Sequence, residues 1–190
     1  MMDDANPWSV PVVVAQIPDT GLNRDIDTTP DQRKALAELG GLRDVMSANA
    51  SLDLTLMREG RVHVRGRVRA RIGQICVVSL DPIENEIDEA IDLVFAPPEQ
   101  IPALADLVED AAESDSEIPD PPEPIVNGAI DLGRLATDAL FLGIDPYPRK
   151  PDVVFEPPVV PDDPEDHPFA ALKALKRDAD PPDSSKPKRD

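Results

Sequence analysis

The candidates for nucleophilic chemistry in this chain are one cysteine, Cys76, and two histidines, His63 and His167. A catalytic nucleophile needs a base and an orienting acid within hydrogen-bond reach. His63 and Cys76 lie thirteen positions apart in one extended segment, which holds them tens of ångströms apart. The sequence also lacks a phosphate-cradling glycine loop and a dinucleotide fingerprint. We therefore expect no enzymatic activity and no small-molecule substrate.

The same residues are too few for a metal site of the cysteine–histidine kind. Such a site needs about four ligands close together, and this chain has one cysteine and two scattered histidines. A cysteine at the end of a strand can simply be a small buried hydrophobic residue. We expect no metal and no cofactor.

A row of arginines in residues 61–79 is the second chemical feature. Read at a period of two residues, this segment predicts one long strand with two unlike faces. The basic face carries Arg61, His63, Arg65, Arg67, Arg69 and Arg71. The apolar face carries Val62, Val64, Val68, Ala70 and Ile72.

The arginine row has two interpretations. Carboxylates on neighbouring strands can neutralise it, with pairs worth roughly 0.2–1 kcal/mol each; the candidates are Asp53, Glu86, Asp88 and Asp92. Alternatively, Arg65, Arg67, Arg69 and Arg71 contact ribonucleic acid phosphates or an acidic partner. We favour neutralisation, because arginines two residues apart on one face repel one another and acidic neighbours are therefore expected. The segment also has no aromatic side chains on which bases could stack, which further disfavours single-stranded RNA.

The elements around this row predict an α+β fold. Further strands are expected at residues 8–17, 22–26, 51–57 and 86–95, the last with an imperfect or frayed start because Glu89 falls on its apolar side. Residues 51–57 and the arginine strand form an antiparallel hairpin about Glu59 and Gly60. Gly66 and Gly73 indicate bends or bulges where the sheet curls. Asn127-Gly128 is a turn signal.

Two helices are indicated by their caps. One begins after Thr29, with Pro30 and Gln32 completing a capping box, ends near residues 40–41, and buries Leu36, Leu39 and Leu42. The other begins after Asp131 and ends before Gly143. We expect a curled antiparallel sheet with two or three packed helices over residues 7–160, and a tail over residues 161–190 with a short helix at about 168–177.

Acidic charge dominates the composition. The formal net charge is −19, which argues against broad non-specific nucleic-acid binding and favours a basic protein partner. Residues 97–124 carry nine carboxylates and no Lys or Arg, and we expect them to form a partly flexible acidic insertion. A local basic patch could still act, because charges more than about 8–10 Å apart are screened.

The sequence gives no signal for export or membrane insertion. Its first ten residues lack a basic region followed by an apolar one, and no apolar run approaches the roughly 20 residues that span a bilayer. A single cysteine fits a reducing compartment. We expect a soluble cytoplasmic protein with no membrane contact.

Several segments together resemble the YceD family, the large ribosomal RNA subunit accumulation proteins of bacteria and plastids. In chain order they are PWSVPV, which resembles the alphaproteobacterial branch, then GQICVVSLDP, an acidic stretch, IDLGRLATDALFLGIDPYPRKP and HPFAALKALKR. Many members have a Cys-x-x-Cys pair where this chain has Cys76 and Ser79, and some have a second pair where residues 145–152 have no cysteine. A metal site of other members therefore cannot be transferred to this chain.

The resemblance implies a non-enzymatic factor that supports accumulation of large-subunit ribosomal RNA and assembly of that subunit. Our preferred mechanism is that acidic surfaces, chiefly residues 97–124, bind a basic ribosomal protein or processing factor. One alternative is direct RNA binding through Arg65, Arg67, Arg69 and Arg71. Another is an interaction or chaperone domain unrelated to ribosomes.

Overall fold

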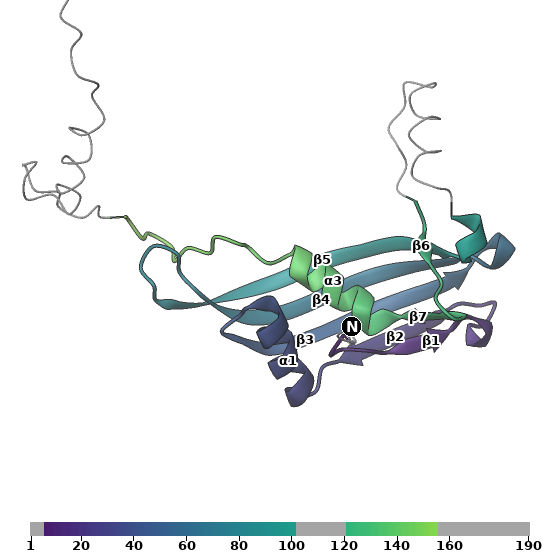
Figure 1. Cartoon of the computed structure of the whole chain (residues 1–190), viewed down its shortest axis with the longest axis horizontal. Helices are drawn as coiled ribbons and strands as arrows, with labels where there is room; N and C mark the ends of the chain where they lie inside the picture. Colours follow the sequence, from purple (N-terminus) through teal and green to yellow (C-terminus); the bar gives the residue numbers. More distant parts are fainter. Residues whose placement is uncertain (1–5, 102–120, 156–190) are drawn as a thin grey trace, which may run out of the picture. The chain divides into compact units, whose positions relative to one another are not determined.

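A curled five-stranded sheet dominates the part of the chain that the computed structural model describes, residues 6–101 and 121–155 (Figure 1). Its strand order is β2-β3-β4-β5-β6. The strands are β2 (Leu22–Asp27), β3 (Asp44–Leu56), β4 (Val62–Ile75), β5 (Pro82–Ala96) and β6 (Glu123–Pro124). Strands β2 to β5 pair in antiparallel fashion, and β6 pairs in parallel with the end of β5. The expected α+β fold with a curled sheet is confirmed.

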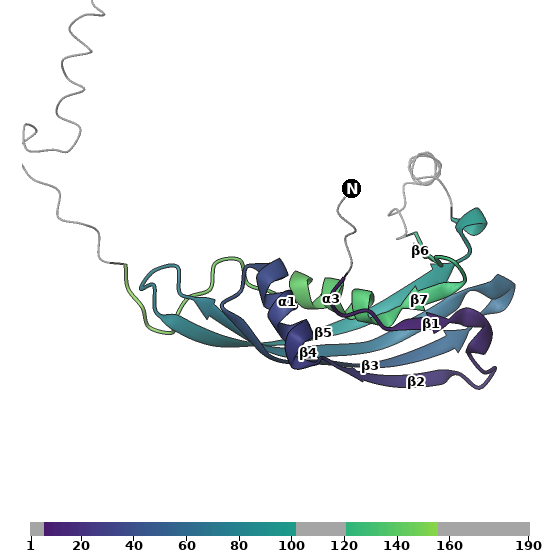
Figure 2. The ribbon, with the colours of Figure 1, turned by 60° about the horizontal axis from the view of Figure 1, so that its bottom comes forward.

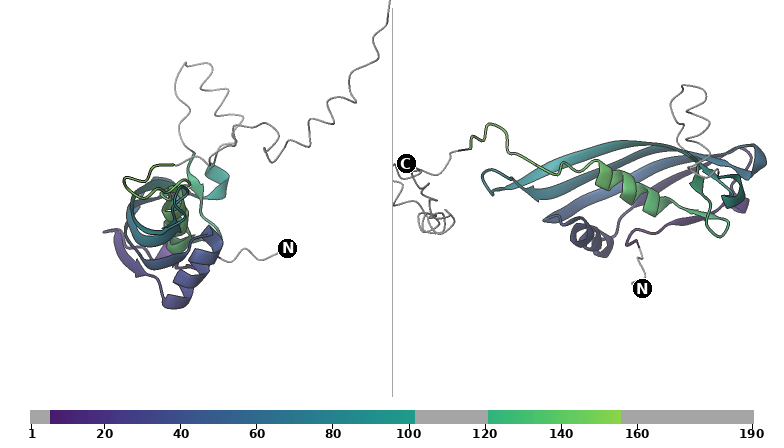
Figure 3. Two further views of the ribbon diagram at one scale, coloured as in Figure 1. Left: turned by 90° about the vertical axis from the view of Figure 1, so that its left-hand side faces the viewer. Right: turned by 45° about the horizontal axis from the view of Figure 1, so that its top comes forward.

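Two helices and a small second sheet cover the concave face. They are α1 (Pro30–Gly40), α3 (Leu132–Leu142), and the pair β1 (Pro11–Val13) and β7 (Ala129–Asp131). Single turns of 3-10 helix lie at η1 (Val14–Gln16), η2 (Arg58–Gly60) and η3 (Pro98–Gln100). Helix α1 packs on β3, and α3 packs on β5, β4 and β3. Figures 2 and 3 show both helices on the same side of the sheet, with the sheet curving around α3.

The core lies between the concave face and these helices. Every second residue of β4 points into it, and Val62, Val64, Val68 and Ile72 have no exposed surface. From the other side it receives Leu132, Ala136 and Leu140 of α3, together with Trp8 and Leu36. The predicted alternation of β4 is therefore confirmed, and it turns the arginine face toward solvent.

The predicted helix caps are confirmed. Thr29 Oγ1 accepts from the Gln32 amide at 3.3 Å, while Gln32 Oε1 accepts from the Thr29 amide at 2.8 Å. Asp131 accepts from the first amides of α3. One expected core residue of α1 is wrong: Leu39 is 56% exposed. Ala37, which follows Leu36, is buried instead, because α1 packs on β3 and buries only these two of its residues.

The two glycines of β4 do not mark bulges in that strand. The register of β4 on β5 is unbroken, and the irregularity against β3 falls between Val45 and Ser47. Gly66 instead allows a close approach of β3, since a Cβ there would lie 2.0 Å from the Ser51 carbonyl oxygen. Any side chain at this position would collide with β3, so the position requires glycine.

Other boundaries differ from those expected. The strand predicted at residues 8–17 is short, because β1 ends at Val13 and a 3-10 turn follows. Strand β5 begins at Pro82, and Glu89 is half-buried within a continuous ladder, so the expected frayed start is wrong. The Asn127-Gly128 turn is confirmed by positive φ angles at both residues. Most of the acidic insertion, His167 and the expected helix at 168–177 lie outside the described residues, and the limits of the domain and tail remain predictions.

Candidate interaction surface

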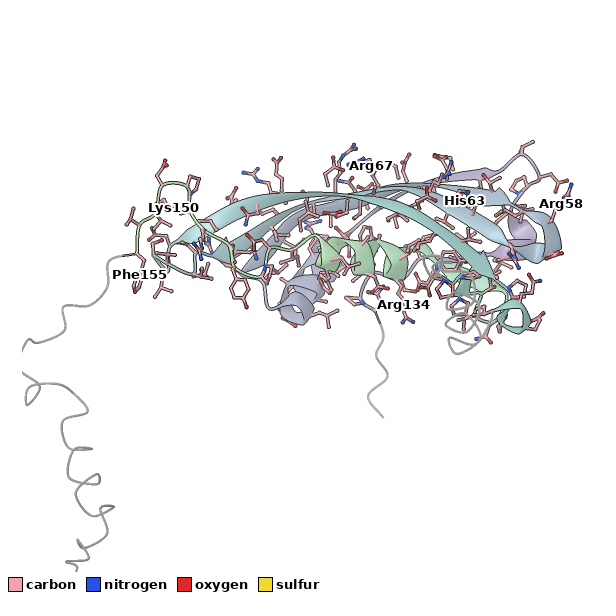
Figure 4. All side chains as sticks on the ribbon, turned by 90° about the horizontal axis from the view of Figure 1, so that it is seen from above. Arg58, His63, Arg67, Arg134, Lys150 and Phe155 are labelled. Carbon is pink, nitrogen blue, oxygen red and sulfur yellow. The ribbon has the colours of Figure 1, made fainter. Side chains whose placement is uncertain are left out.

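Strand β4 places Arg65, Arg67, Arg69 and Arg71 together on the convex face of the sheet. All four are exposed, because the residues that alternate with them are buried beneath the helices. Figure 4 shows Arg67 and His63 on the face opposite to Arg134 of α3. The arginines that the sequence placed on one face are therefore exposed together, and the carboxylates beside them decide what they can bind.

Asp88 of β5 pairs with the two central arginines. Arg67 Nε lies 2.7 Å from Asp88 Oδ1, and Arg69 Nε lies 3.4 Å from Asp88 Oδ2. The hydrogen bond from Arg67 lowers the pKa of Asp88, and the same bond raises the pKa of Arg67. Both groups are thus charged at neutral pH, and the expected neutralisation is confirmed at Asp88.

The ends of the arginine row have carboxylates of their own. Asp92 Oδ1 lies 2.6 Å from His63 Nε2, and Asp92 Oδ2 lies 3.3 Å from Arg65 Nε. The hydrogen bond with His63 is the main cause that lowers the pKa of Asp92, and the charge of Arg65 adds to it. At the other end Arg71 pairs with Glu84. The expected role of Asp92 is confirmed.

Two other expected partners make no ion pair with the row among the described residues. Asp53 lies opposite Arg65 but accepts a 2.8 Å hydrogen bond from Asn23. Glu86 lies opposite Arg71, whose carboxylate partner is two positions earlier on β5. An arginine can reach a diagonal neighbour, so facing positions alone do not determine its partner. The partner that the sequence analysis missed is Glu84, and its place in the alternating acids Glu84, Glu86 and Asp88 was the signal that could have found it.

The convex face as a whole is acidic. Across β2 to β5 its carboxylates include Asp25, Asp27, Asp53, Glu84, Glu86, Asp88 and Asp92. These acids outnumber the four arginines on the same strands, so the formal charge of the face is negative. The arginine row is a basic column within an acidic surface.

Cys76 is buried in the connection between β4 and β5. Its Sγ accepts backbone hydrogen bonds from Lys150 at 3.3 Å and from Ser79 at 3.4 Å. These bonds, with Lys150 contributing most, lower the pKa of Cys76 to about 6, although burial acts in the opposite direction. The Val77 amide also donates to the Pro148 carbonyl at 3.0 Å. The thiol is therefore buried as expected. Its hydrogen bond with Lys150 and the bond from Val77 to Pro148 hold the segment after α3 against this turn.

The remaining concave features offer little chemistry. An open groove beside the Cys76 turn is lined by the end of α1 and the loop after it, by β4 and Val77, and by the segment after α3; Arg43 and Asp145 are its charged members. Within residues 6–101 and 121–155, no group of three or more His, Cys, Asp or Glu side chains is arranged to hold a metal ion. No helix in the described part of the chain is long and apolar enough to cross a membrane.

Comparison with known proteins gives one assignment. No curated protein and no solved structure matches the chain. The sequence model of one family, described as large ribosomal RNA subunit accumulation protein YceD, matches residues 64–176, which is more than half of the 190 residues. The match begins within β4 and includes β5 and α3, so it covers the arginine row and the Cys76 turn. The chain therefore belongs to the YceD family of large ribosomal RNA subunit accumulation proteins.

Proposed function

We propose that this protein is a non-enzymatic cytoplasmic factor that supports accumulation of large-subunit ribosomal RNA and biogenesis of that subunit by binding a basic ribosomal or processing protein. Membership of the YceD family supports the ribosomal setting. The observation that carries the choice of partner is the ion-paired arginine row, whose four guanidinium groups lie beside carboxylates of β5. Basic groups that are already paired leave an acidic surface to attract a basic partner.

Residues 97–124 supply further carboxylates for a basic partner. This segment carries nine carboxylates and joins β5 to β6. A basic ribosomal protein that has not yet met RNA needs its own charge neutralised, and clustered carboxylates can do this. We therefore assign the segment as the chief contact with the partner.

The second candidate is direct RNA binding through Arg65, Arg67, Arg69 and Arg71. It is favoured by their exposure, since the four side chains are between 48% and 65% exposed. Exposed ion pairs contribute about 0–1 kcal/mol, so phosphate groups could compete for these arginines. A salt titration of binding to ribosomal RNA fragments tests this candidate, because an RNA binder shows an affinity that falls steeply as salt rises. No measurable affinity at low salt would refute it.

The test is affinity purification of the tagged full-length protein, with and without nuclease, in parallel with a variant lacking residues 99–122. We expect a basic protein to remain bound to the wild-type protein after nuclease treatment. The deletion should reduce both this capture and large-subunit RNA levels. Unchanged RNA levels and capture in the deletion variant would refute the acidic-segment mechanism. Loss of all captured protein on nuclease treatment would favour the RNA-binding candidate.

A further inference from the structure

The outer edge of β5 is the longest unpaired strand edge in the described part of the chain. Strand β6 pairs only with Phe95 and Ala96 of β5. Residues 82–94 therefore have β4 on one side and no strand on the other among the described residues. A free edge of this length exposes a row of amide and carbonyl groups that can pair with another chain.

The direction of these backbone groups follows from the neighbouring hydrogen bonds. The Ala96 carbonyl accepts from the Ile125 amide at 2.9 Å, so it points away from β4. The register of β4 on β5 is unbroken from Ile75 and Pro82 to Val62 and Phe95. Since backbone direction alternates along a strand, the even-numbered residues from 84 to 94 present their amides and carbonyls to the open edge.

The side chains on these same residues make the edge acidic. They point to the convex face, and four of the six are Glu84, Glu86, Asp88 and Asp92. Arginines of β4 pair with three of these carboxylates from the inner side, and Glu86 makes no ion pair among the described residues. The Asp88 carbonyl accepts from Arg67 Nη2 at 3.3 Å, which leaves its second lone pair available. A strand added here would place alternate side chains beside these carboxylates, as β4 does with its arginines on the inner side.

We propose that the outer edge of β5 binds, by strand addition, an extended segment of a basic protein with Lys or Arg at alternate positions. This inference rests on the proposed function. It adds that the basic partner binds as an extended segment paired with β5. Charge complementarity selects this occupant: Glu86 makes no ion pair among the described residues, and the exposed Asp88 shows that one carboxylate here can serve two cations, since it pairs with both Arg67 and Arg69. A second copy of this chain is disfavoured, because antiparallel pairing of two β5 edges would set carboxylates against carboxylates. Main-chain hydrogen bonds supply affinity in this mode, and the alternating side chains supply specificity.

The direct test is amide hydrogen exchange in the full-length protein. The probe is a ten-residue synthetic peptide that alternates Lys or Arg with Val or Thr. We expect it to slow exchange of the even-numbered β5 amides, Glu86 to Asp92, by at least about tenfold. The odd-numbered amides already bond to β4 and should change little. A peptide that binds without slowing the even-numbered amides would be held by side chains alone, which overturns strand addition.

A variant pair tests the backbone contribution separately. Ala90→Pro removes one outward amide and obstructs the edge, and it leaves the bonds to β4 intact because that amide faces away from β4. Ala90→Ser at the same exposed position retains the amide. We expect peptide affinity to fall by about tenfold or more for Ala90→Pro and by less than about twofold for Ala90→Ser. Equal affinity of the two variants would refute the proposal.

Further outcomes distinguish this inference from the broader function. Thermal unfolding of Ala90→Pro shows whether the sheet is retained, and the wild-type exchange measurement remains decisive if it is not. If an RNA oligonucleotide altered exchange of the β5 amides and the peptide did not, the basic-strand proposal would be wrong. Normal large-subunit RNA levels after loss of the whole protein would refute the proposed function. Normal levels with Ala90→Pro alone would count only against the edge.

Discussion

At the scale of single residues, Cys76 shows how backbone groups can determine the state of a side chain. Amides from Lys150 and Ser79 point at one sulfur, although 71 positions separate the two donors in the chain. Hydrogen bonds to a thiolate are stronger than those to a thiol. The folded chain therefore favours the ionised form of a buried cysteine.

This arrangement predicts a pH dependence. The ultraviolet absorbance of the thiolate should titrate with a midpoint near pH 6 in the folded protein, against about 8.5 in the unfolded chain. Because folding lowers the pKa of Cys76, its contribution to the free energy of unfolding is complete above the unfolded pKa and is lost as pH falls toward 6. Cys76→Ser is the control, since it removes the absorbance and this part of the pH dependence. A folded-state midpoint near 8.5 would contradict the prediction.

Substitution of Gly66 by alanine should lower the free energy of unfolding, although it adds only one methyl group. Gly66→Ala would place a methyl group 2.0 Å from the Ser51 carbonyl oxygen and 2.8 Å from Leu52 Cδ2. Since β3 must move to admit it, we expect a loss of about 1–3 kcal/mol in the free energy of unfolding, measured by urea denaturation. Gly41→Asn is the matched control, because a Cβ there meets nothing within 4 Å and Asn tolerates its left-handed backbone. Equal losses would show that steric contact is not the cause.

At the scale of elements, the capping residues of α1 give the clearest link from sequence to stability. Thr29→Ala removes the side-chain acceptor for the Gln32 amide. We expect a loss of about 1 kcal/mol in the free energy of unfolding, measured by denaturant titration. Thr29→Ser retains the acceptor and should change stability by only a few tenths of a kcal/mol. If the Ser variant were as unstable as the Ala variant, the methyl group rather than the cap would be responsible.

The elements were largely predictable, and their ends were less so. Capping and turn residues act locally, so the start of α1 and the Asn127-Gly128 turn followed from sequence. Strand β5 starts earlier than its hydrophobic pattern suggests, because pairing with β4 orders residues whose own pattern is weak. Leu39 was assigned to the core from its spacing, but the narrow contact of α1 with β3 leaves it exposed.

At the scale of the whole molecule, the function of the arginine row depends on the charges around it. The chain has a formal net charge of −19, and the convex face contributes to it because its carboxylates outnumber its four arginines. Ion pairing with β5 thus reduces the attraction of this face for RNA. We therefore expect the arginine row to bind RNA more tightly once its carboxylate partners are replaced.

Asp88→Asn with Asp92→Asn should expose that capacity. The double variant removes the partners of Arg65, Arg67 and Arg69. We expect the double variant to bind single-stranded RNA more tightly than the wild type at low salt. A plot of the logarithm of its binding constant against the logarithm of salt concentration should have a slope of about −2. The reason is that three unpaired guanidinium groups can displace counterions from phosphates.

The control is Asp25→Asn with Asp27→Asn, which changes the net charge equally on β2, a strand that β3 separates from the arginines of β4. It should gain little affinity for RNA. Equal gains by the two double variants would show that net charge alone governs binding. Wild-type affinity as high as that of the Asp88 and Asp92 variant would show that the ion pairs do not mask the arginines.

The sequence alone determined the α+β class, the two-faced arginine strand and the resemblance to the YceD family, because periodicity, capping and short motifs are local properties. Only the tertiary structure decided which carboxylates pair with the arginines, since strand register and side-chain reach set those distances. It also decided that residues 82–94 of β5 have a paired strand on one side only within the described part of the chain, because the extent of pairing by β6 is a property of the whole sheet.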